Sequence, residues 1–221
     1  PAFICGVAGS GTTLLAGLLH QRYEVAANAR ESARWAPQHS VLHIRPIADY
    51  PDLPEYFEHL FFARDVSAQE VREESLRLYR GLSRWPKLSN VVLDKAPNTH
   101  LVRAGTFHAA FPESTFLLIV RDPVSNIEGL RRKWPLFGEE KLTQVCTFWN
   151  DVHRVFMADI ARFASSVKIT TYEWLVQNTD ATVADIAGFV GLRERKDLLA
   201  YQDIGSAPGK GLRNVDHSEI Q

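Results

Sequence analysis

The sequence predicts an α/β fold of three layers, in which helices cover both faces of a central parallel sheet. Residues 2–6 form an apolar run that enters a glycine-rich turn, a pattern typical of a strand leading into a helix. Residues 115–120 (TFLLIV) lack polar alternation, as expected of a parallel strand buried on both faces. Helical patterns lie between such runs, and strands alternating with helices favour a doubly wound sheet.

The remaining strands and the helices follow from the same patterns. Residues 13–20 carry leucines at helical spacing, and residues 91–93 and 168–171 (KITT) are further strand candidates. Other helical patterns are predicted over residues 65–82, 101–111, 125–134, 139–164 and 182–190, the last of which ends at Gly191.

Two segments carry loop signals. Residues 41–58 are rich in proline and acidic side chains, so they predict a surface excursion or lid. Residues 205–221 are rich in glycine and polar side chains and predict a mobile loop.

The composition sets limits on size and partners. A chain of 221 residues, 45% apolar and 23% charged, predicts one domain over 1–221. The formal net charge of −1 gives no general attraction to nucleic acid or to an anionic membrane, so we expect neither partner. The uncharged stretch 3–19 is shorter than a typical membrane span.

The two cysteines carry information about compartment. Cys5 and Cys146 have neither disulfide-framework nor zinc-site spacing, which favours a reducing compartment and predicts a cytoplasmic protein without a metal. A signal or anchor upstream of Pro1 stays an open alternative.

The glycine-rich turn (GVAGSGTTLLAGLL, residues 6–19) is close to a phosphate-binding loop. Gly6, Gly11 and Thr13 match the pattern G-x-x-x-x-G-K-[ST], but Thr12 stands in the lysine position. Backbone N–H groups and the helix dipole converge on such a turn and suit a phosphate or sulfate group. Without the lysine, the loop suits a smaller anion than a triphosphate. Alternatively, the cluster is only a turn between strand and helix.

Several segments then resemble one family in order along the chain. The string GSGTTLL resembles the loop P-[RK]-S-G-T-T-[LW] of sulfotransferases that use 3′-phosphoadenosine 5′-phosphosulfate (PAPS). Similar to other segments of that family are LDKAPNTH (93–100), FPESTFLLIVRDP (111–123), KITTYEWLVQNTDATVADIAGFVGL (168–192) and GKGLRN (209–214). The resemblance is nearest to bacterial and tyrosylprotein-type members.

This resemblance implies a fold and an activity. The fold would be the sulfotransferase variant of the P-loop nucleoside triphosphate hydrolase architecture. The activity would move a sulfuryl group from PAPS to a hydroxyl or amine of a small-molecule or peptidyl acceptor. The product of the donor would be 3′-phosphoadenosine 5′-phosphate (PAP), and no metal would be needed.

The resemblance also implies roles for the loop and for one lysine. The residues that would hold the 5′-phosphosulfate are Gly9, Ser10, Gly11, Thr12 and Thr13. At Gly9 the chain departs from the family, which carries Arg or Lys there. Lys95 follows the apolar run VVL at a strand's carboxyl end and would contact the sulfuryl group, whereas the alternative is a solvated loop lysine.

The 3′-phosphate would be held by Arg121, which follows the strand 115–120. Alternatively, Arg121 pairs with Asp122. The family carries a serine eight residues after this arginine, where this chain has Gly129. Ser125 lies one helical turn earlier and could supply the hydroxyl, or it only begins the helix after a proline.

The remaining ligand contacts involve the second half of the chain. Tyr172 would flank the adenine, or it is a half-buried packing residue. Lys210, Gly211 and Arg213 would close over the 3′-phosphate, or they belong to a flexible basic tail.

Transfer needs a base that accepts the proton of the acceptor group. Glu31 resembles the catalytic glutamate of the tyrosylprotein-type enzymes, and the alternative is a solvated acid between Arg30 and Arg34. His100 is a second candidate, but we expect it to cap or pack near the following helix.

The sequence also allows two other functions. The losses of side chains at Gly9 and Gly129 would also fit a non-catalytic nucleotide-binding module. A degenerate P-loop kinase would need an acid for Mg²⁺, for which Asp94 is the candidate.

Overall fold

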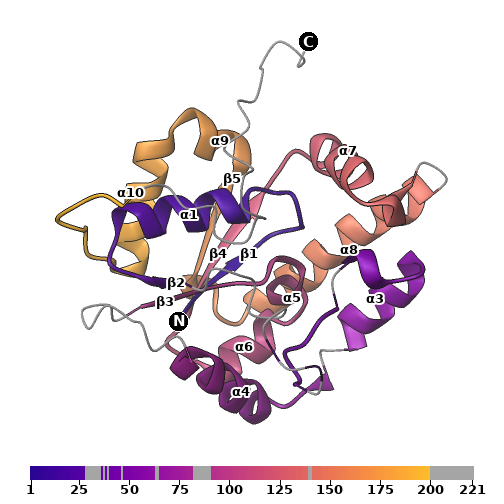
Figure 1. Ribbon diagram of the computed structural model, residues 1–221, viewed down its shortest axis with the longest axis horizontal. Coiled ribbons are helices and arrows are strands. Elements are labelled where there is room, and N and C mark those ends of the chain that lie inside the picture. The colour runs from indigo at the N-terminus through magenta and orange to yellow at the C-terminus, as the bar shows by residue number, and fades with distance from the viewer. Residues whose placement is uncertain are drawn as a thin grey trace.

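The computed structural model describes residues 1–27, 36, 38, 40–45, 47–62, 65–81, 91–138 and 141–199. In this part of the chain, five parallel strands form one sheet in the order β2-β3-β1-β4-β5 (Figure 1). The strands are β1 (Ala2–Cys5), β2 (Ala26–Ala27), β3 (Val92–Lys95), β4 (Thr115–Val120) and β5 (Val167–Thr171).

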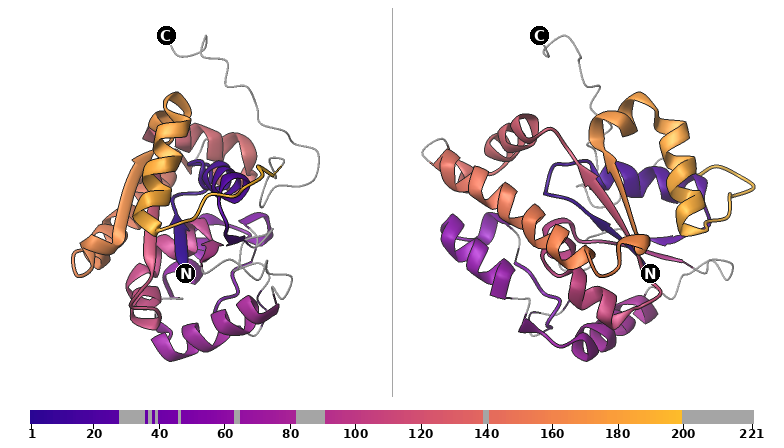
Figure 2. Two further views of the ribbon diagram at one scale, coloured as in Figure 1. Left: turned by 90° about the vertical axis from the view of Figure 1, so that its left-hand side faces the viewer. Right: turned by 180° about the vertical axis from the view of Figure 1, so that it is seen from behind.

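Helices connect the strands and cover both faces of the sheet (Figure 2). They are α1 (Thr12–Arg22), α3 (Leu53–Phe62), α4 (Ala68–Gly81), α5 (Pro97–Val102), α6 (Ala104–Ala110), α7 (Pro123–Lys133), α8 (Leu142–Ile160), α9 (Tyr172–Gln177) and α10 (Thr179–Val190). The predicted three-layer α/β/α class is therefore confirmed. No helix in the described part of the chain is long and apolar enough to cross a membrane.

The period of two along each strand divides the core into two clusters. Phe3 and Phe116 pack on one face with the aromatic side chains of α3, α6 and α8. Ile4 and Leu117 pack on the other face with α1 and α10. Because Phe3 is in register with Asp94 and Ile4 with Lys95, these two charged neighbours on β3 point to opposite faces.

The parallel arrangement brings the carboxyl ends of three strands together. The central strand β1 lies between β3 and β4, so Cys5, Lys95 and Val120 end their strands at one edge of the sheet. Open α/β sheets bind ligands at this edge, close to the point where the strand order reverses.

Several predicted boundaries are wrong. The segment 41–58 is not a surface excursion, because Leu53 and Tyr56 are fully buried and begin the helix α3. Their spacing, continued by Leu60, is helical although prolines and acids surround it. The predicted helix 101–111 is two helices, the first of which begins at Pro97, a favoured first position of a helix.

Candidate active site

The loop between β1 and α1 depends on its glycines. Gly9 (φ +86°) and Gly11 (φ +102°) are in the left-handed region that glycine tolerates. A Cβ on Gly6 would lie 2.3 Å from Ser10 Oγ and 2.6 Å from the Ile119 carbonyl oxygen, so no side chain fits there. The loop therefore approaches β4 closely and turns directly into the first N–H groups of α1, which have no partner within the helix.

The loop also presents hydroxyl groups. Ser10 is only 1% exposed, and its Oγ has no hydrogen-bond partner among the residues that the structure describes. Thr12 is buried at the first position of α1, and Thr13 Oγ1 accepts a hydrogen bond from Lys95 Nζ at 3.0 Å. A buried hydroxyl without a partner is costly, so the Ser10 Oγ fits a position that a ligand oxygen satisfies.

Lys95 lies beside this loop and not in solvent. It ends β3, it is 2% exposed, and its Nζ contacts the first turn of α1 through Thr13. The alternative of a solvated loop lysine is therefore wrong. A buried ammonium group next to a helix N-terminus concentrates positive potential, which favours a bound anion.

Arg121 lies on the other side of the loop. It follows β4 directly, and its Nη1 donates a hydrogen bond to the Gly9 carbonyl oxygen at 3.2 Å. Its Nε is buried and has no hydrogen-bond partner in the described part of the chain. Asp122 does not pair with it but caps α7, accepting a hydrogen bond from Ser125 N at 2.8 Å. The hydrogen bonds from the Ser125 backbone and hydroxyl lower the pKa of the Asp122 carboxyl.

Gly129 stands where the resembling family has a serine, and Ser125 lies one helical turn earlier; the surroundings of the two positions differ. Ser125 begins α7 and bonds to Asp122, which is the helix-start arrangement. A Cβ on Gly129 would lie 4.0 Å from Arg121 Nη1, so position 129 faces the guanidinium. The structure thus leaves space beside Arg121 where the family has a hydroxyl.

Tyr172 covers the loop from α9. Its ring is half-buried and lies under the Arg121 guanidinium, with 4.6 Å between the Arg121 Cζ and the ring centroid. A Cβ on Gly11 would lie 2.5 Å from Tyr172 Cδ2, so the ring also rests against the loop backbone. The aromatic face is therefore placed within the candidate site, between a glycine and an arginine.

His100 lies in the core, as expected from its packing alternative. It is completely buried and makes edge contacts with Phe3 and Phe107, with ring centroids 5.0 Å and 4.8 Å away. Its Nδ1 accepts a hydrogen bond from Ala96 N at 3.2 Å. These contacts place it on the aromatic face of the sheet, away from the loop.

Four predicted site residues, Glu31, Lys210, Gly211 and Arg213, fall outside the described residues, as does the loop predicted over 205–221. The roles of these four residues stay predictions. Among the residues that the structure does describe, no group of three or more His, Cys, Asp or Glu side chains could hold a metal ion.

Two asparagines that the sequence did not single out contact the loop at Ala8. Asn98 Oδ1 accepts a hydrogen bond from Ala8 N at 2.9 Å, and Asn126 Nδ2 donates one to the Ala8 carbonyl oxygen at 3.0 Å. Each asparagine lies in the first turn of a helix just after a strand, close to Lys95 or Arg121 in the sequence. In the sequence, only this proximity to Lys95 and Arg121 points to the two asparagines.

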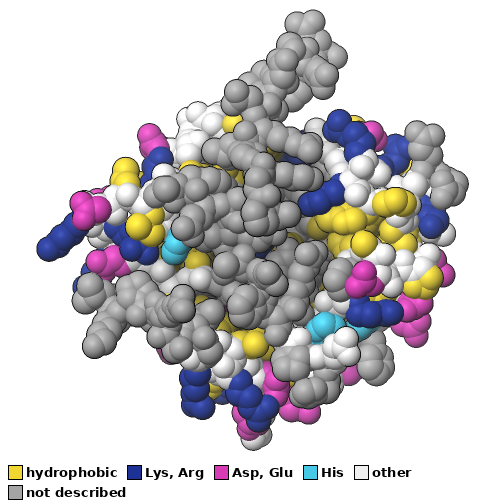
Figure 3. Space-filling model, viewed as in Figure 1, with side chains coloured by type: hydrophobic (Ala, Val, Ile, Leu, Met, Phe, Trp, Pro, Cys, Tyr) yellow, Lys and Arg dark blue, Asp and Glu magenta, His cyan; other side chains and the backbone are white. Residues whose placement is uncertain are grey.

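The rest of this edge of the molecule is partly apolar. On the face drawn in Figure 3, hydrophobic side chains reach the surface over α3, α7 and α8, next to Lys and Arg side chains. Because α7 contacts the loop through Asn126, this surface adjoins the candidate site.

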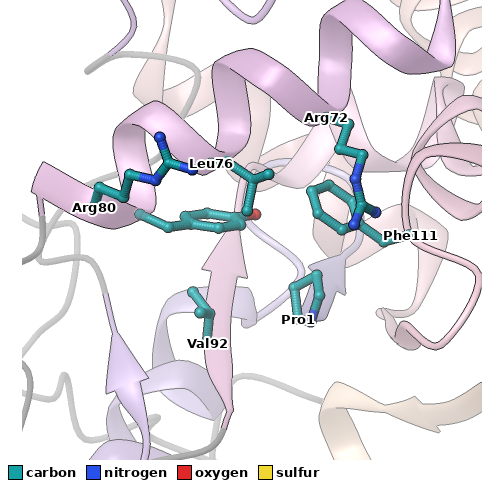
Figure 4. Close-up of a pocket in the computed structure, with 7 residues that line it drawn as sticks. Pro1, Arg72, Leu76, Arg80, Val92 and Phe111 are labelled. Atoms are coloured by element: carbon teal, nitrogen blue, oxygen red, sulfur yellow. The ribbon is translucent and has the colours of Figure 1, made fainter.

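A separate pocket of about 520 Å³ lies at the opposite edge of the sheet (Figure 4). It is mostly apolar and lies between α4 and the amino ends of β1 and β3, lined by Pro1, Arg72, Leu76, Tyr79, Arg80, Val92 and Phe111. Arg72 Nη1 already donates a hydrogen bond to the Ala110 carbonyl oxygen. The loop, and not this pocket, lies at the edge where α/β sheets bind ligands.

Comparisons with known proteins bear on the family and the fold of the chain. A family model described as "Sulfotransferase family" matches residues 1–197. A solved sulfotransferase domain from the curacin biosynthetic pathway is 19% identical, with a TM-score of 0.56 over 91% of this chain and 77% of that one. No curated protein matches the sequence.

Two further solved structures are similar. A sulfotransferase from Alicyclobacillus acidocaldarius is 14% identical, with a TM-score of 0.54 over 92% of this chain and 87% of that one. A sulfotransferase from Mycobacterium avium is 14% identical, with a TM-score of 0.63 over 86% of this chain and 63% of that one. At these identities the likeness is one of fold.

Proposed function

Because the chain belongs to the sulfotransferase family, we propose that it transfers a sulfuryl group from PAPS to a hydroxyl or amine of an acceptor. One observation carries the proposal. The carboxyl ends of three neighbouring strands bring Lys95, Arg121 and the Ser10 hydroxyl around one glycine-rich loop. All three side chains offer hydrogen-bond donors, which is the chemistry that phosphate and sulfate oxygens require.

The residues present fit the donor that the family implies. The 5′-phosphosulfate would be held by the N–H groups of Gly9, Gly11, Thr12 and Thr13 and by the Ser10 Oγ, for which no described residue supplies a hydrogen-bond partner. The buried Nε of Arg121 has the same need and would bond to the 3′-phosphate. Tyr172, which lies beside Gly11 and under the Arg121 guanidinium, would flank the adenine.

The reaction that we propose moves one sulfuryl group and one proton. PAPS supplies the sulfuryl group, and PAP is the leaving group, through its 5′-phosphate oxygen. The acceptor oxygen or nitrogen attacks sulfur as the bond from sulfur to the phosphate oxygen breaks, and Glu31 takes the acceptor's proton. Lys95 stabilises the negative charge that develops on the leaving oxygen, since its ammonium group lies beside the first turn of α1.

The position of Asp94 argues against a kinase. That carboxylate is buried on the other face of β3, where Asp94 Oδ2 accepts a hydrogen bond from the Tyr79 hydroxyl at 2.6 Å. A Mg²⁺ ligand would have to face the loop. The non-catalytic module is distinguished from an enzyme by measuring binding and transfer separately.

The test compares nucleotide binding with sulfate transfer. We expect PAP to raise the melting temperature more than ATP at equal concentration, because a ligand stabilises the state that binds it. Arg121→Ala should weaken PAP binding by about 1.5 to 3 kcal/mol, the value of a hydrogen bond to a charged group. Arg154→Ala, an exposed arginine paired with Asp151 on α8, is the control and should leave binding unchanged.

Transfer is measured with ³⁵S-labelled PAPS and a panel of acceptors that includes aliphatic and phenolic alcohols, amines and tyrosine peptides. Glu31→Gln should preserve PAP binding and lower turnover. If PAP bound and no acceptor became labelled, the protein would be the non-catalytic module. If PAP did not bind at all, the proposed function would be wrong.

A further inference from the structure

We propose that Asn98 and Asn126 are positioning residues that hold the phosphate-binding loop in its binding conformation by fixing both polar groups of Ala8. This inference rests on the proposed function, since it concerns the same loop. Asn98 approaches from α5 and accepts the Ala8 N–H, and Asn126 approaches from α7 and donates to the Ala8 carbonyl oxygen. The two distances, 2.9 Å and 3.0 Å, are those of well-formed hydrogen bonds.

Both asparagines are anchored at their second amide atom. Asn126 is 0% exposed, and its Oδ1 accepts a hydrogen bond from Trp149 Nε1 of α8 at 3.1 Å. Asn98 is 7% exposed, and its Nδ2 donates to the Tyr56 hydroxyl of α3. Each asparagine therefore has one hydrogen bond to the loop and one to an aromatic side chain of another helix.

The chemistry of the partners fixes the orientation of both amides. A backbone N–H only donates and a carbonyl only accepts, so Asn98 must turn its oxygen to Ala8 and Asn126 its nitrogen. The indole N–H of Trp149 also only donates, so it requires the Asn126 oxygen and leaves the Asn126 nitrogen for Ala8. An aspartate at position 98 could still accept the Ala8 N–H, but an aspartate at position 126 could not donate to the Ala8 carbonyl oxygen. Substitution by aspartate therefore distinguishes the two positions.

These contacts also account for the glycine that replaces Arg or Lys in the loop. A Cβ on Gly9 would lie 3.2 Å from Asn126 Nδ2, and Gly9 has a φ of +86°. The conformation that Asn126 holds through Ala8 is thus one that favours glycine at position 9.

The test uses two charge-matched variants. Asn98→Asp and Asn126→Asp each place one negative charge beside the loop at pH 8. In Asn98→Asp a carboxylate oxygen can still accept the Ala8 N–H, whereas in Asn126→Asp a carboxylate oxygen faces the Ala8 carbonyl oxygen, and neither atom can donate. We expect PAP affinity, measured by calorimetry, to fall at least tenfold further in Asn126→Asp than in Asn98→Asp. Equal losses in the two variants would overturn the proposal.

A second readout does not depend on PAP. Hydrogen exchange of the ligand-free protein, followed over a peptide that contains residues 6–13, should be faster in Asn98→Ala and Asn126→Ala than in the wild type. Thr182→Val is the control, because it removes a buried hydroxyl of α10 that donates a hydrogen bond to the carbonyl oxygen of Asn178, the residue before the helix. It should change neither loop exchange nor PAP affinity.

The outcomes separate this inference from the proposed function. If the wild type did not bind PAP, the proposed function would fail, and loop exchange in the alanine variants would still decide whether the asparagines hold the loop. If PAP bound the wild type and both alanine variants equally well, the positioning role would be overturned. Unchanged loop exchange in both alanine variants would overturn it as well.

Discussion

Asp94 and Lys95 are adjacent at the carboxyl end of β3, and both are almost completely buried, yet their surroundings differ. Asp94 lies among aromatic side chains, where it accepts a hydrogen bond from Tyr79 and lies 3.8 Å from His100 Nε2. Lys95 lies against the glycine-rich loop through Thr13. Adjacent buried charges on one strand thus have different partners, a core tyrosine on one face and the candidate ligand site on the other.

The alternation of a strand produces this difference directly. Phe3 is in register with Asp94, and its ring belongs to the aromatic cluster, whereas Ile4 is in register with Lys95 and packs against α1. Lys95 contacts the first turn of α1 through Thr13, whereas Val7 and Ala8 of the loop pack with the aromatic cluster on the other face. Substitutions at the two positions should therefore affect different properties of the protein.

The largest effect is expected on the loop side. Lys95→Ala should lower turnover by about 10² to 10³, the usual result of removing one group that stabilises a developing negative charge. The free energy of unfolding should change little, because the variant also removes the cost of burying an ammonium group. Steady-state transfer assays and urea unfolding measure the two quantities. A variant that lost stability but kept turnover would contradict the assignment.

On the aromatic side, Asp94→Ala should lower the free energy of unfolding by about 1 to 3 kcal/mol, because the buried Tyr79 hydroxyl loses this acceptor. PAP affinity should stay within twofold of the wild type. The double variant Asp94→Ala/Tyr79→Phe should recover part of the loss, since neither polar partner then remains. Additive losses in urea unfolding would show that the Tyr79 contact is not the cause.

The sequence predicted where two charged residues of the candidate site lie, for a physical reason. Lys95 and Arg121 follow apolar runs, and the carboxyl ends of parallel strands must meet at one edge, so their proximity follows from the strand pattern alone. The contacts of Ala8 with Asn98 and Asn126 join residues 90 and 118 positions apart. No local pattern encodes such pairs, because they depend on how α5 and α7 pack against the loop.

The misassigned helix α3 has a different cause. Its apolar residues Leu53, Tyr56 and Leu60 are correctly spaced, but Pro51, Pro54 and acidic neighbours are also typical of a surface loop. Burial against the aromatic cluster decides the conformation of this segment, and that information is tertiary.

A third prediction concerns the two glycines where the family has polar side chains. Gly9→Arg should not strengthen PAP binding and should cost about 1 to 2 kcal/mol of stability, because φ is +86° and Asn126 is adjacent. Gly129→Ser is the matched contrast, since the position is helical and faces Arg121 with space to spare. It should tighten PAP binding up to about tenfold through one added hydrogen bond. Calorimetry that found the opposite order would show that the loop tolerates a side chain at position 9.

The smallest effect concerns pH and returns to the aromatic face. Burial raises the pKa of the Cys5 thiol well above its ordinary value, and the nearby Asp94 charge raises it further. Above about pH 8.5 the unfolded chain therefore loses a proton that the folded chain keeps, and the free energy of unfolding falls as pH rises, by at most about 1.4 kcal/mol per pH unit. Cys5→Ala should remove the part of this pH dependence that the thiol causes, and the effect should be seen between about pH 8.5 and 9.5. Tyr79 does not contribute in this range, because its pKa is also raised and an ordinary tyrosine ionises only near pH 10. Urea unfolding at several pH values compares Cys5→Ala with the wild type. An unchanged slope in Cys5→Ala would mean that the thiol ionises as readily in the folded chain as in the unfolded one.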